Sequence, residues 1–148
     1  MANELFSSMH ISAAGMSAQR SRMDIVAENI ANSESTRTKE GGAYRRRQVI
    51  FQATPIEQKF SEVFKSSLAG GGRQSVRVVD VIQDQRPFRE VHDPSHPDAN
   101  ADGIVQLPNV NMVEEMVDMN SAARSFEANV TSMEASKRMF IKSLELLR

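Results

Sequence analysis

The chain contains no cysteine, no tryptophan and only one tyrosine among its 148 residues. Without cysteine it can form no disulfide, no thiolate metal site and no cysteine nucleophile. Its net charge is −1, so it lacks the basic excess that is typical of nucleic-acid-binding proteins. No uncharged apolar run approaches the roughly 18 residues that a membrane-spanning helix needs. We therefore predict a protein that neither binds nucleic acid nor inserts into a membrane.

Motifs for catalysis and for general secretion are also missing. The chain has no G-x-S-x-G motif, no phosphate-binding glycine loop and no plausible catalytic triad. The N-terminal segment has no basic start, and Ser7, Ser8, His10 and Ser12 interrupt its apolar residues, so we expect no cleaved secretory signal peptide. These observations predict a protein that is not an enzyme and that uses no cofactor.

Both ends of the chain carry a heptad pattern of apolar residues, many of them drawn from its nine methionines. A sustained 3.5-residue repeat is typical of a seam that packs against another helix. The other end of the same chain and further copies of the chain are the candidates for that helix. We predict that this assembly seam consists of Met9, Met16, Met23, Ile30, Met116, Met119, Ala123, Phe126, Val130, Met133, Phe140, Leu144 and Leu147.

The terminal segments predict two long helices, over residues 4–32 and 111–148. Asn111 can cap the second helix, with Glu114 three residues on. The middle of the chain predicts strands over 44–53 and 74–83, and an extended loop over 84–108 that includes a short strand at 103–107. Between the first two strands, Thr54 and Pro55 carry helix-start signals, and the helix would run to the glycines at 70–72.

These elements predict an α+β fold. Long N- and C-terminal helices, paired as a coiled coil, would form a discontinuous axial domain from residues 1–36 and 109–148. Residues 37–108 would form a small, β-containing central domain. The pattern is typical of a structural assembly subunit, and a soluble coiled-coil adaptor or small oligomer is the main structural alternative.

The stretch from Asp98 to Gly103 matches the first half of an EF-hand calcium loop, D-x-N-x-D-G. The twelfth position, which should supply a bidentate carboxylate, is Asn109, so a turn-rich loop is the better interpretation. A calcium-responsive binding module at this stretch remains an alternative. His92 and His96 lie nearby but lack a third ligand on a defined element, so we predict no metal site.

The arginine run at residues 45–47 does not form one basic patch, because alternate residues of a strand face opposite sides. We expect these side chains to lie on a solvated edge or to form salt bridges with a neighbouring subunit.

Several segments resemble the basal-body rod proteins of the bacterial flagellum, a group of the flagellar axial proteins. The segment from Ala27 to Asn32 is similar to the A-x-N-[LI]-A-N motif near the N-terminus of axial proteins, here Ala27, Asn29, Ile30, Ala31 and Asn32. Residues 42–46, 93–103, 107–110, 115–118 and 123–130 extend the resemblance, specifically to a proximal rod protein. The shared loop includes Asp93, Pro94, Pro97, Gly103, Pro108 and Asn109.

The resemblance implies a structural subunit of the proximal rod, the drive shaft that carries torque across the periplasm. It implies synthesis in the cytoplasm, export by the flagellar type III apparatus, and polymerisation through the terminal helices. The expected partners are further copies of the chain, other rod proteins, the hook–basal-body adaptor at the rod base and the export apparatus.

Overall fold

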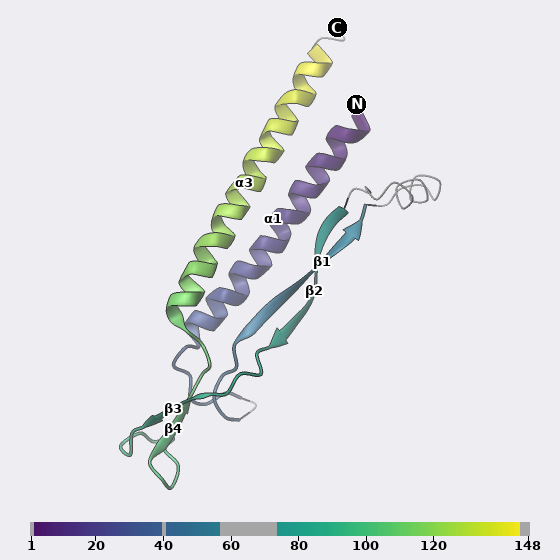
Figure 1. Cartoon of the computed structure of the whole chain (residues 1–148). Helices are drawn as coiled ribbons and strands as arrows, with labels where there is room; N and C mark the ends of the chain where they lie inside the picture. The colour runs from purple at the N-terminus through teal and green to yellow at the C-terminus, as the bar shows by residue number, and fades with distance from the viewer. Residues whose placement is uncertain (1, 40, 57–73, 146–148) are drawn as a thin grey trace. The chain divides into compact units, whose positions relative to one another are not determined.

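The computed structural model describes residues 2–39, 41–56 and 74–145, and these residues have an α+β architecture (Figure 1). The chain divides into two compact units. Unit 1 comprises Met1–Arg20, Phe51–Val79 and Ala123–Arg148, and unit 2 comprises Ser21–Ile50 and Asp80–Ala122. The division into an axial and a central domain stays a prediction.

The two predicted long helices are present as α1, Ala2–Ala31, and α3, Met112–Glu145. Side-chain hydrogen bonds lie at the start of α3 and at the end of α1. At the start of α3, Asn111 Oδ1 accepts a hydrogen bond from Val113 N at 3.1 Å, as predicted. At the end of α1, Glu28 O accepts from Asn32 N at 3.1 Å and also from Asn32 Nδ2 at 2.9 Å. Neither helix, among the described residues, has an apolar stretch long enough to cross a membrane.

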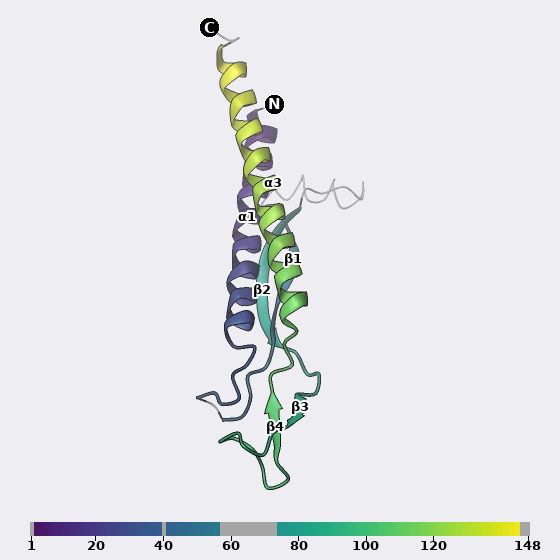
Figure 2. The same ribbon diagram turned by 90° about the vertical axis from the view of Figure 1, so that its left-hand side faces the viewer.

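Strands β1, Arg47–Pro55, and β2, Gln74–Gln83, form a two-stranded sheet (Figure 2). The helix start predicted at Thr54 is wrong, because Thr54 and Pro55 are the last residues of β1. Proline is tolerated there because both strands of a two-stranded sheet are edge strands, which leave backbone donors unpaired in any case. The remainder of that predicted helix, residues 57–73, lies outside the described residues.

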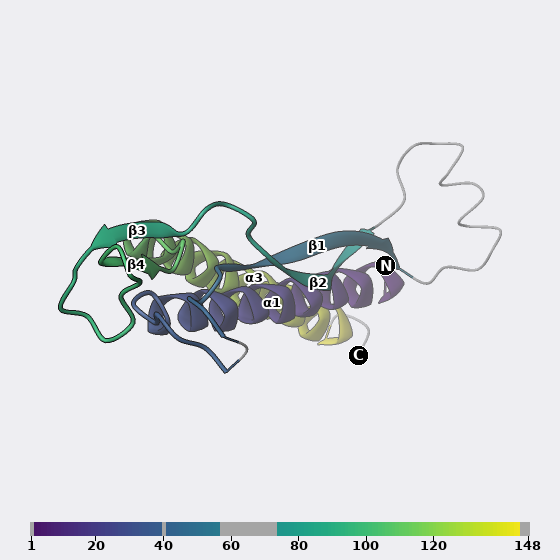
Figure 3. The same cartoon turned by 90° about the horizontal axis from the view of Figure 1, so that it is seen from below.

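Strands β3, Arg89–His92, and β4, Ile104–Leu107, pair antiparallel, with Arg89 opposite Leu107 and His92 opposite Ile104 (Figure 3). The short strand predicted at 103–107 is therefore confirmed as β4. The prediction of a loop over the rest of 84–108 missed β3. All four residues of β3 are exposed and only Val91 is aliphatic, so this strand carries no alternating apolar signal.

Among the described residues, the largest fully buried side chains are Glu115, Asn29 and Pro108, and two of these three are polar. The buried apolar residues are mostly small, and all except Ala18 belong to unit 2. They are Ala18, Val26, Ala43, Tyr44, Val105, Val110 and Ala122. The interior of unit 2 is thus organised around polar groups, whose burial is favourable only when they are hydrogen-bonded.

The turn before β4 gives a first prediction. Gly103 has a φ of +72°, and a Cβ there would lie 3.0 Å from Pro94 Cγ and 3.1 Å from His92 Cε1. We expect Gly103→Ala to cost about 1–2 kcal/mol for the left-handed backbone, plus the cost of the crowding. Exchange of the Asp93 amide hydrogen, which bonds Gly103 O at 2.9 Å, should then accelerate by about tenfold or more.

Gly41→Ala is the matched control. Gly41 has a φ of +90°, but no atom lies within 4 Å of the place that an added methyl group would occupy, so only the backbone cost applies. Equal changes at the Asp93 amide in both variants would show that the contacts around Gly103 do not matter.

Candidate functional site

Asn29, in the last turn of α1, is fully buried and uses its whole hydrogen-bonding capacity. Its Nδ2 donates to Arg47 O and to Glu115 Oε2, both at 2.9 Å. Its Oδ1 accepts from the Tyr44 hydroxyl at 3.0 Å and from Arg47 N at 2.9 Å. A side-chain amide has two donor hydrogens and two acceptor positions, so no part of Asn29 is left unsatisfied. This one side chain joins α1, the start of β1 and the start of α3 within unit 2.

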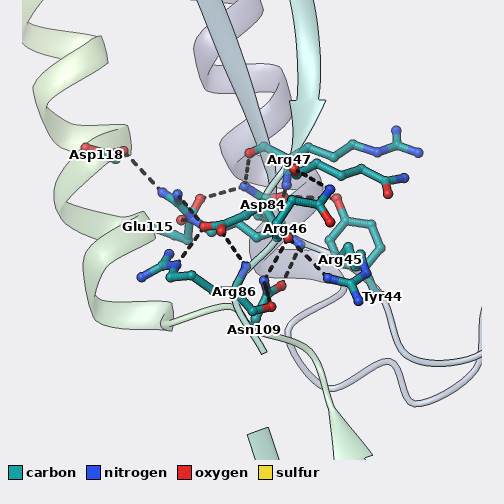
Figure 4. A network of polar contacts seen from close by, with 12 residues as sticks. Tyr44, Arg45, Arg46, Arg47, Asp84, Arg86, Asn109, Glu115 and Asp118 are labelled. Atoms are coloured by element: carbon teal, nitrogen blue, oxygen red, sulfur yellow. Dashed lines mark hydrogen bonds and ion pairs between the residues drawn. The ribbon is translucent and has the colours of Figure 1, made fainter. Parts of the chain in front are cut away.

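Glu115, in the first turn of α3, is also fully buried, and Arg46 neutralises it. Arg46 Nε donates to Glu115 Oε1 at 2.5 Å, and the other carboxylate oxygen accepts from the Asn29 amide. Figure 4 shows the Arg46 side chain reaching two further carboxylates, those of Asp84 at 3.7 Å and Asp118 at 3.8 Å. A buried carboxylate persists as an ion only when it is paired and hydrogen-bonded, and both conditions hold here.

Asn109 fastens the loop before α3 to the same region. Its Oδ1 accepts from Arg46 N at 2.9 Å, while its Nδ2 donates to Asp84 O and Arg86 O, both at 3.2 Å. Hydrogen bonds from the Arg86 backbone and side chain hold the pKa of the Asp84 carboxyl below its usual value, with Arg46 adding to the effect. We call Asn29, Tyr44, Arg46, Asn109 and Glu115 the buried polar network.

The arginine run at 45–47 finds its partners within the chain. Arg46 belongs to the buried polar network, Arg47 Nη1 lies 2.9 Å from Glu28 Oε1, and the Arg45 guanidinium lies 4.3 Å from the centre of the Phe88 ring. The prediction of a solvated edge or of bridges to a neighbouring subunit is therefore wrong for Arg46, which is 9 % exposed. The prediction placed Arg46 in a strand, but β1 begins at Arg47, and Arg46 is buried against Glu115 and Asn109.

The axial-family motif supplies two of these structural roles. Asn29 is the centre of the buried polar network and Asn32 caps the end of α1, while Ile30 is half-buried and Ala27 and Ala31 are exposed. Whether these five residues act as a recognition feature of axial proteins stays a prediction.

In unit 1, the facing sides of α1 and α3 are polar. Ser8 Oγ lies 3.2 Å from Ser136 Oγ, and the Ser12 hydroxyl donates to Ser132 Oγ at 3.5 Å. Ser12 and Ser136 are buried, at 5 % and 4 % exposed. Hydroxyl pairs of this kind hold two helices close together with little apolar contact.

Two further contacts complete the helix pair of unit 1. A Cβ added at Gly15 would lie only 2.9 Å from Asn129 Nδ2, so glycine permits the close approach. Nearer the chain ends, the rings of Phe6 and Phe140 are tilted with their centres 5.4 Å apart. Phe140 is thus the one predicted seam residue that makes a ring contact between the helices among the described residues.

The other seam residues flank these contacts. Met116 and Leu144 are 54 % and 52 % exposed, and Leu147 lies outside the described residues. The remaining seam residues are half-buried: Met9, Met16, Met23, Ile30, Met119, Ala123, Phe126, Val130 and Met133. The buried positions of α3 are Glu115, Ala122 and Ser136, at intervals of seven and fourteen residues, and none of them is a methionine. Coiled-coil pairing through the apolar seam stays a prediction.

The family loop is held by turns of its own. Asp93 Oδ1 accepts from the Ser95 hydroxyl at 2.6 Å and from Ser95 N at 3.0 Å, and these bonds lower the pKa of the Asp93 carboxyl. Pro94 and Pro97 are exposed, whereas Pro108, which precedes Asn109 of the buried polar network, is fully buried.

The oxygens of the calcium-like stretch are engaged within the chain. Asn100 Oδ1 accepts from Asp102 N at 3.1 Å and from Ile104 N at 2.8 Å, and Asp98 Oδ2 accepts from the Thr36 hydroxyl at 2.8 Å. In the part of the chain that the structure describes, no three His, Cys, Asp or Glu residues gather as a group that could hold a metal ion. The hydrogen bonds at this stretch are those of a turn-rich loop.

Two family descriptions match the chain, one near each end. Residues 9–37 match "Flagella basal body rod protein", and residues 101–146 match "Flagellar basal body rod FlgEFG protein C-terminal". The first segment covers most of α1 and the turn after it. The second covers β4 and α3.

Curated relatives match over nearly the whole length. The flagellar basal-body rod protein FlgC of Bacillus subtilis is 44% identical over 147 residues, which cover 95% of this chain and 97% of the relative. FlgC of Borreliella burgdorferi is 43% identical, with 97% and 98% covered. FlgC of Escherichia coli O157:H7 is 37% identical, with 92% of each chain covered.

The buried carboxylate gives a second prediction. Glu115→Ala would remove the hydrogen-bond acceptor of Arg46 Nε and of Asn29 Nδ2 in a buried place and leave Arg46 only its longer contacts with Asp84 and Asp118, which should lower the free energy of unfolding by about 3–5 kcal/mol. Urea unfolding followed by circular dichroism measures this. Glu114→Ala, at the exposed neighbouring position, should change stability by less than about 0.5 kcal/mol. Equal losses in both variants would contradict the role of Glu115.

The single tyrosine gives a third prediction. Burial, together with the negative charge of Glu28, raises the pKa of Tyr44 from 10.0 to about 12. Because the folded state favours the neutral phenol, stability should decline as the pH rises from about 10 towards 12, by roughly 2–3 kcal/mol at most. Tyr44→Phe should abolish that decline.

Near-ultraviolet absorbance reports this ionisation without ambiguity, since the chain has one tyrosine and no tryptophan. A titration midpoint near 10 in the native protein, equal to that in urea, would contradict the buried hydroxyl contact.

Proposed function

The chain belongs to the FlgC family of flagellar basal-body rod proteins, and we propose that it is a proximal rod subunit that polymerises through its terminal helices. Members of this family are structural components of the flagellar basal body and not enzymes. The observation that carries the proposal is similarity along almost the entire length, with the two family segments falling on α1 and α3.

The distribution of apolar residues supports assembly through the helices. In unit 1 the contacts between α1 and α3 include serine pairs and the close approach of Gly15 to Asn129, while part of the apolar surface of α3 stays exposed. Met139, Ile141 and Leu144 of α3 are 45–56 % exposed. Exposed apolar surface of this kind is typical of interaction sites, and neighbouring subunits would cover it.

The buried polar network supports a role in carrying torque. It ties the end of α1, the start of β1 and the start of α3 together by hydrogen bonds of 2.5–3.0 Å around two buried side chains. Pulling these elements apart would expose or orphan a buried charge, which is costly. A subunit of a drive shaft needs such resistance to local deformation.

We extend the proposal to organisation and partners. Residues 1–36 and 109–148 would form the axial domain, with 37–108 as the central domain. Copies of the chain, other rod proteins and the hook–basal-body adaptor would be its neighbours. Export through the flagellar type III apparatus would precede assembly, and a chain without cysteine carries no disulfide that would oppose passage in an unfolded state.

A fourth prediction tests assembly through the helices. Leu144→Asp should abolish incorporation into basal bodies and motility, because assembly would bury an unpaired carboxylate at a cost of several kcal/mol. Since Leu144 is 52 % exposed in the isolated chain, stability there should change little. Phe126→Asp should likewise block incorporation. Immunoblots of purified basal bodies measure incorporation, and swimming assays measure motility.

Thr131→Asp adds the same charge at an exposed polar position of α3 and is the control. We expect it to incorporate normally. Normal motility of the Leu144→Asp variant would refute assembly through this part of the helix.

A further inference from the structure

A cavity of about 730 Å³ lies within unit 2, beside the end of α1. Its walls come from the end of α1, the loop between α1 and β1, the start of β1 and the end of β2. The volume falls in the range of roughly 300–1,000 Å³ that is typical of ligand-binding sites. The proposed assembly through the helices makes no use of this cavity.

Four cationic side chains line the cavity. Arg45 and Arg47, just before and at the start of β1, are half-buried there. Arg37 and Lys39 are exposed and lie on the loop between α1 and β1. We call this cavity the basic cavity.

Only one of these four cations has an anionic partner among the described residues. Arg47 Nη1 lies 2.9 Å from Glu28 Oε1, and Glu28 is the one acid among the described lining residues. Glu40 belongs to the same loop in the sequence and lies outside the described residues. Even with Glu40 counted, the four cations exceed the acids by two charges.

The charge of Arg45 is held in place but is not neutralised. Its guanidinium lies 4.3 Å from the centre of the Phe88 ring, and its Nη1 donates to the backbone carbonyl of Asp84 at 3.4 Å. Both of these partners are electrically neutral. A guanidinium that is stacked on a ring keeps most of its donors available in a fixed orientation, which suits a carboxylate.

Turn hydrogen bonds hold the described residues of the loop that carries the other two free cations. Thr38 N donates to Gly42 O at 2.9 Å, and Gly41 N donates to Thr38 O at 3.1 Å. Arg37 and Lys39 flank Thr38 in the sequence, and neither side chain makes a hydrogen bond or an ion pair with the residues that the structure describes. They therefore need not break an existing contact in order to bind an anion.

The charge and the volume of the basic cavity indicate which anion it suits. A small cationic excess matches a segment with a few carboxylates, which arginine can bind bidentately. A nucleic acid needs a wider basic field, and the net charge of the whole chain is −1. The cavity is also large enough for several side chains, whereas one inorganic anion would fill only a small part of it.

We propose that the basic cavity binds an acidic segment of a partner protein, whose carboxylates pair with Arg37, Lys39 and Arg45. Charge complementarity carries the proposal, because these three cations have no anionic partner among the described residues. The inference goes beyond the proposed function, since it names a binding site that includes neither the apolar seam nor the helix contacts of unit 1. Such a contact should be sensitive to salt.

A fifth prediction concerns binding of an acidic test peptide to the purified full chain. The probe is a fluorescein-labelled hexaglutamate peptide, measured by fluorescence anisotropy, with hexaglutamine as its neutral counterpart. Hexaglutamate should bind, and its affinity should fall severalfold between about 20 mM and about 200 mM salt because the contact is electrostatic. A Kd above about 1 mM at the lower salt concentration, or equal binding of the two peptides, would overturn the proposal.

Charge reversal locates the binding site. Arg37→Glu together with Lys39→Glu should weaken hexaglutamate binding by about tenfold or more, since two attractions become repulsions. Both side chains are exposed, so the fold should tolerate the change. Arg89→Glu together with Arg124→Glu is the matched control, because it changes the net charge equally at exposed positions outside the cavity. Equal weakening in both double variants would mean attraction to the net charge alone and would overturn the proposal.

Competition at matched ionic strength separates a peptide site from other anion sites. An excess of succinate or of inorganic phosphate should displace little hexaglutamate, because one small anion pairs with fewer cations than a peptide with several carboxylates. Displacement by either anion at a concentration equal to that of the peptide would identify a small-anion site and overturn the proposal. Tighter binding of a single-stranded hexanucleotide than of hexaglutamate would identify a nucleic-acid site and would also overturn it. Each of these outcomes leaves assembly through the helices to be decided by the Leu144→Asp variant.

Discussion

The structure of unit 2 depends on the buried carboxylate of Glu115. A charge placed out of water must be matched by a cation and by hydrogen-bond donors, and here Arg46 and Asn29 supply them. Those two residues come from the segment just before β1 and from the end of α1, so satisfying one side chain positions three segments that are distant in the sequence. Asn109 and Tyr44 then attach the loop before α3 and the turn before β1 to the same centre.

Unit 1 is built on a different principle. Its helix pair is joined by serine hydroxyls, by the small volume of Gly15 and by the ring contact of Phe6 with Phe140. Such contacts allow close approach, and Leu144 of the same helix is 52 % exposed. In the proposed rod subunit, the polar network would keep one part of the chain rigid, and the unused apolar surface would be covered by neighbours.

Local signals were sufficient for most elements. Asn111 marks the start of α3 because a cap acts within one helical turn, and β2 follows from the five β-branched residues among its ten. Local signals failed where pairing decided the outcome. Thr54 and Pro55 are residue types typical of a helix start, yet they are the last residues of β1. β3 contains too few apolar residues to be predicted from the sequence pattern. The apolar seam stays a prediction, and the heptad pattern gave no sign that Glu115 and Ser136 are among the buried residues of α3.

The sequence by itself determined the long terminal helices, the β-containing middle and the family. The helices and strands depend on short-range propensity and periodicity, and the family is indicated by motifs that can be read directly from the sequence. Only the tertiary structure decided that Asn29, Arg46 and Glu115 share one buried site. An arginine, an asparagine and a glutamate look like surface residues when each is considered alone. Their burial becomes favourable only when all three partners are present together, and that condition belongs to the fold and not to any local stretch of sequence.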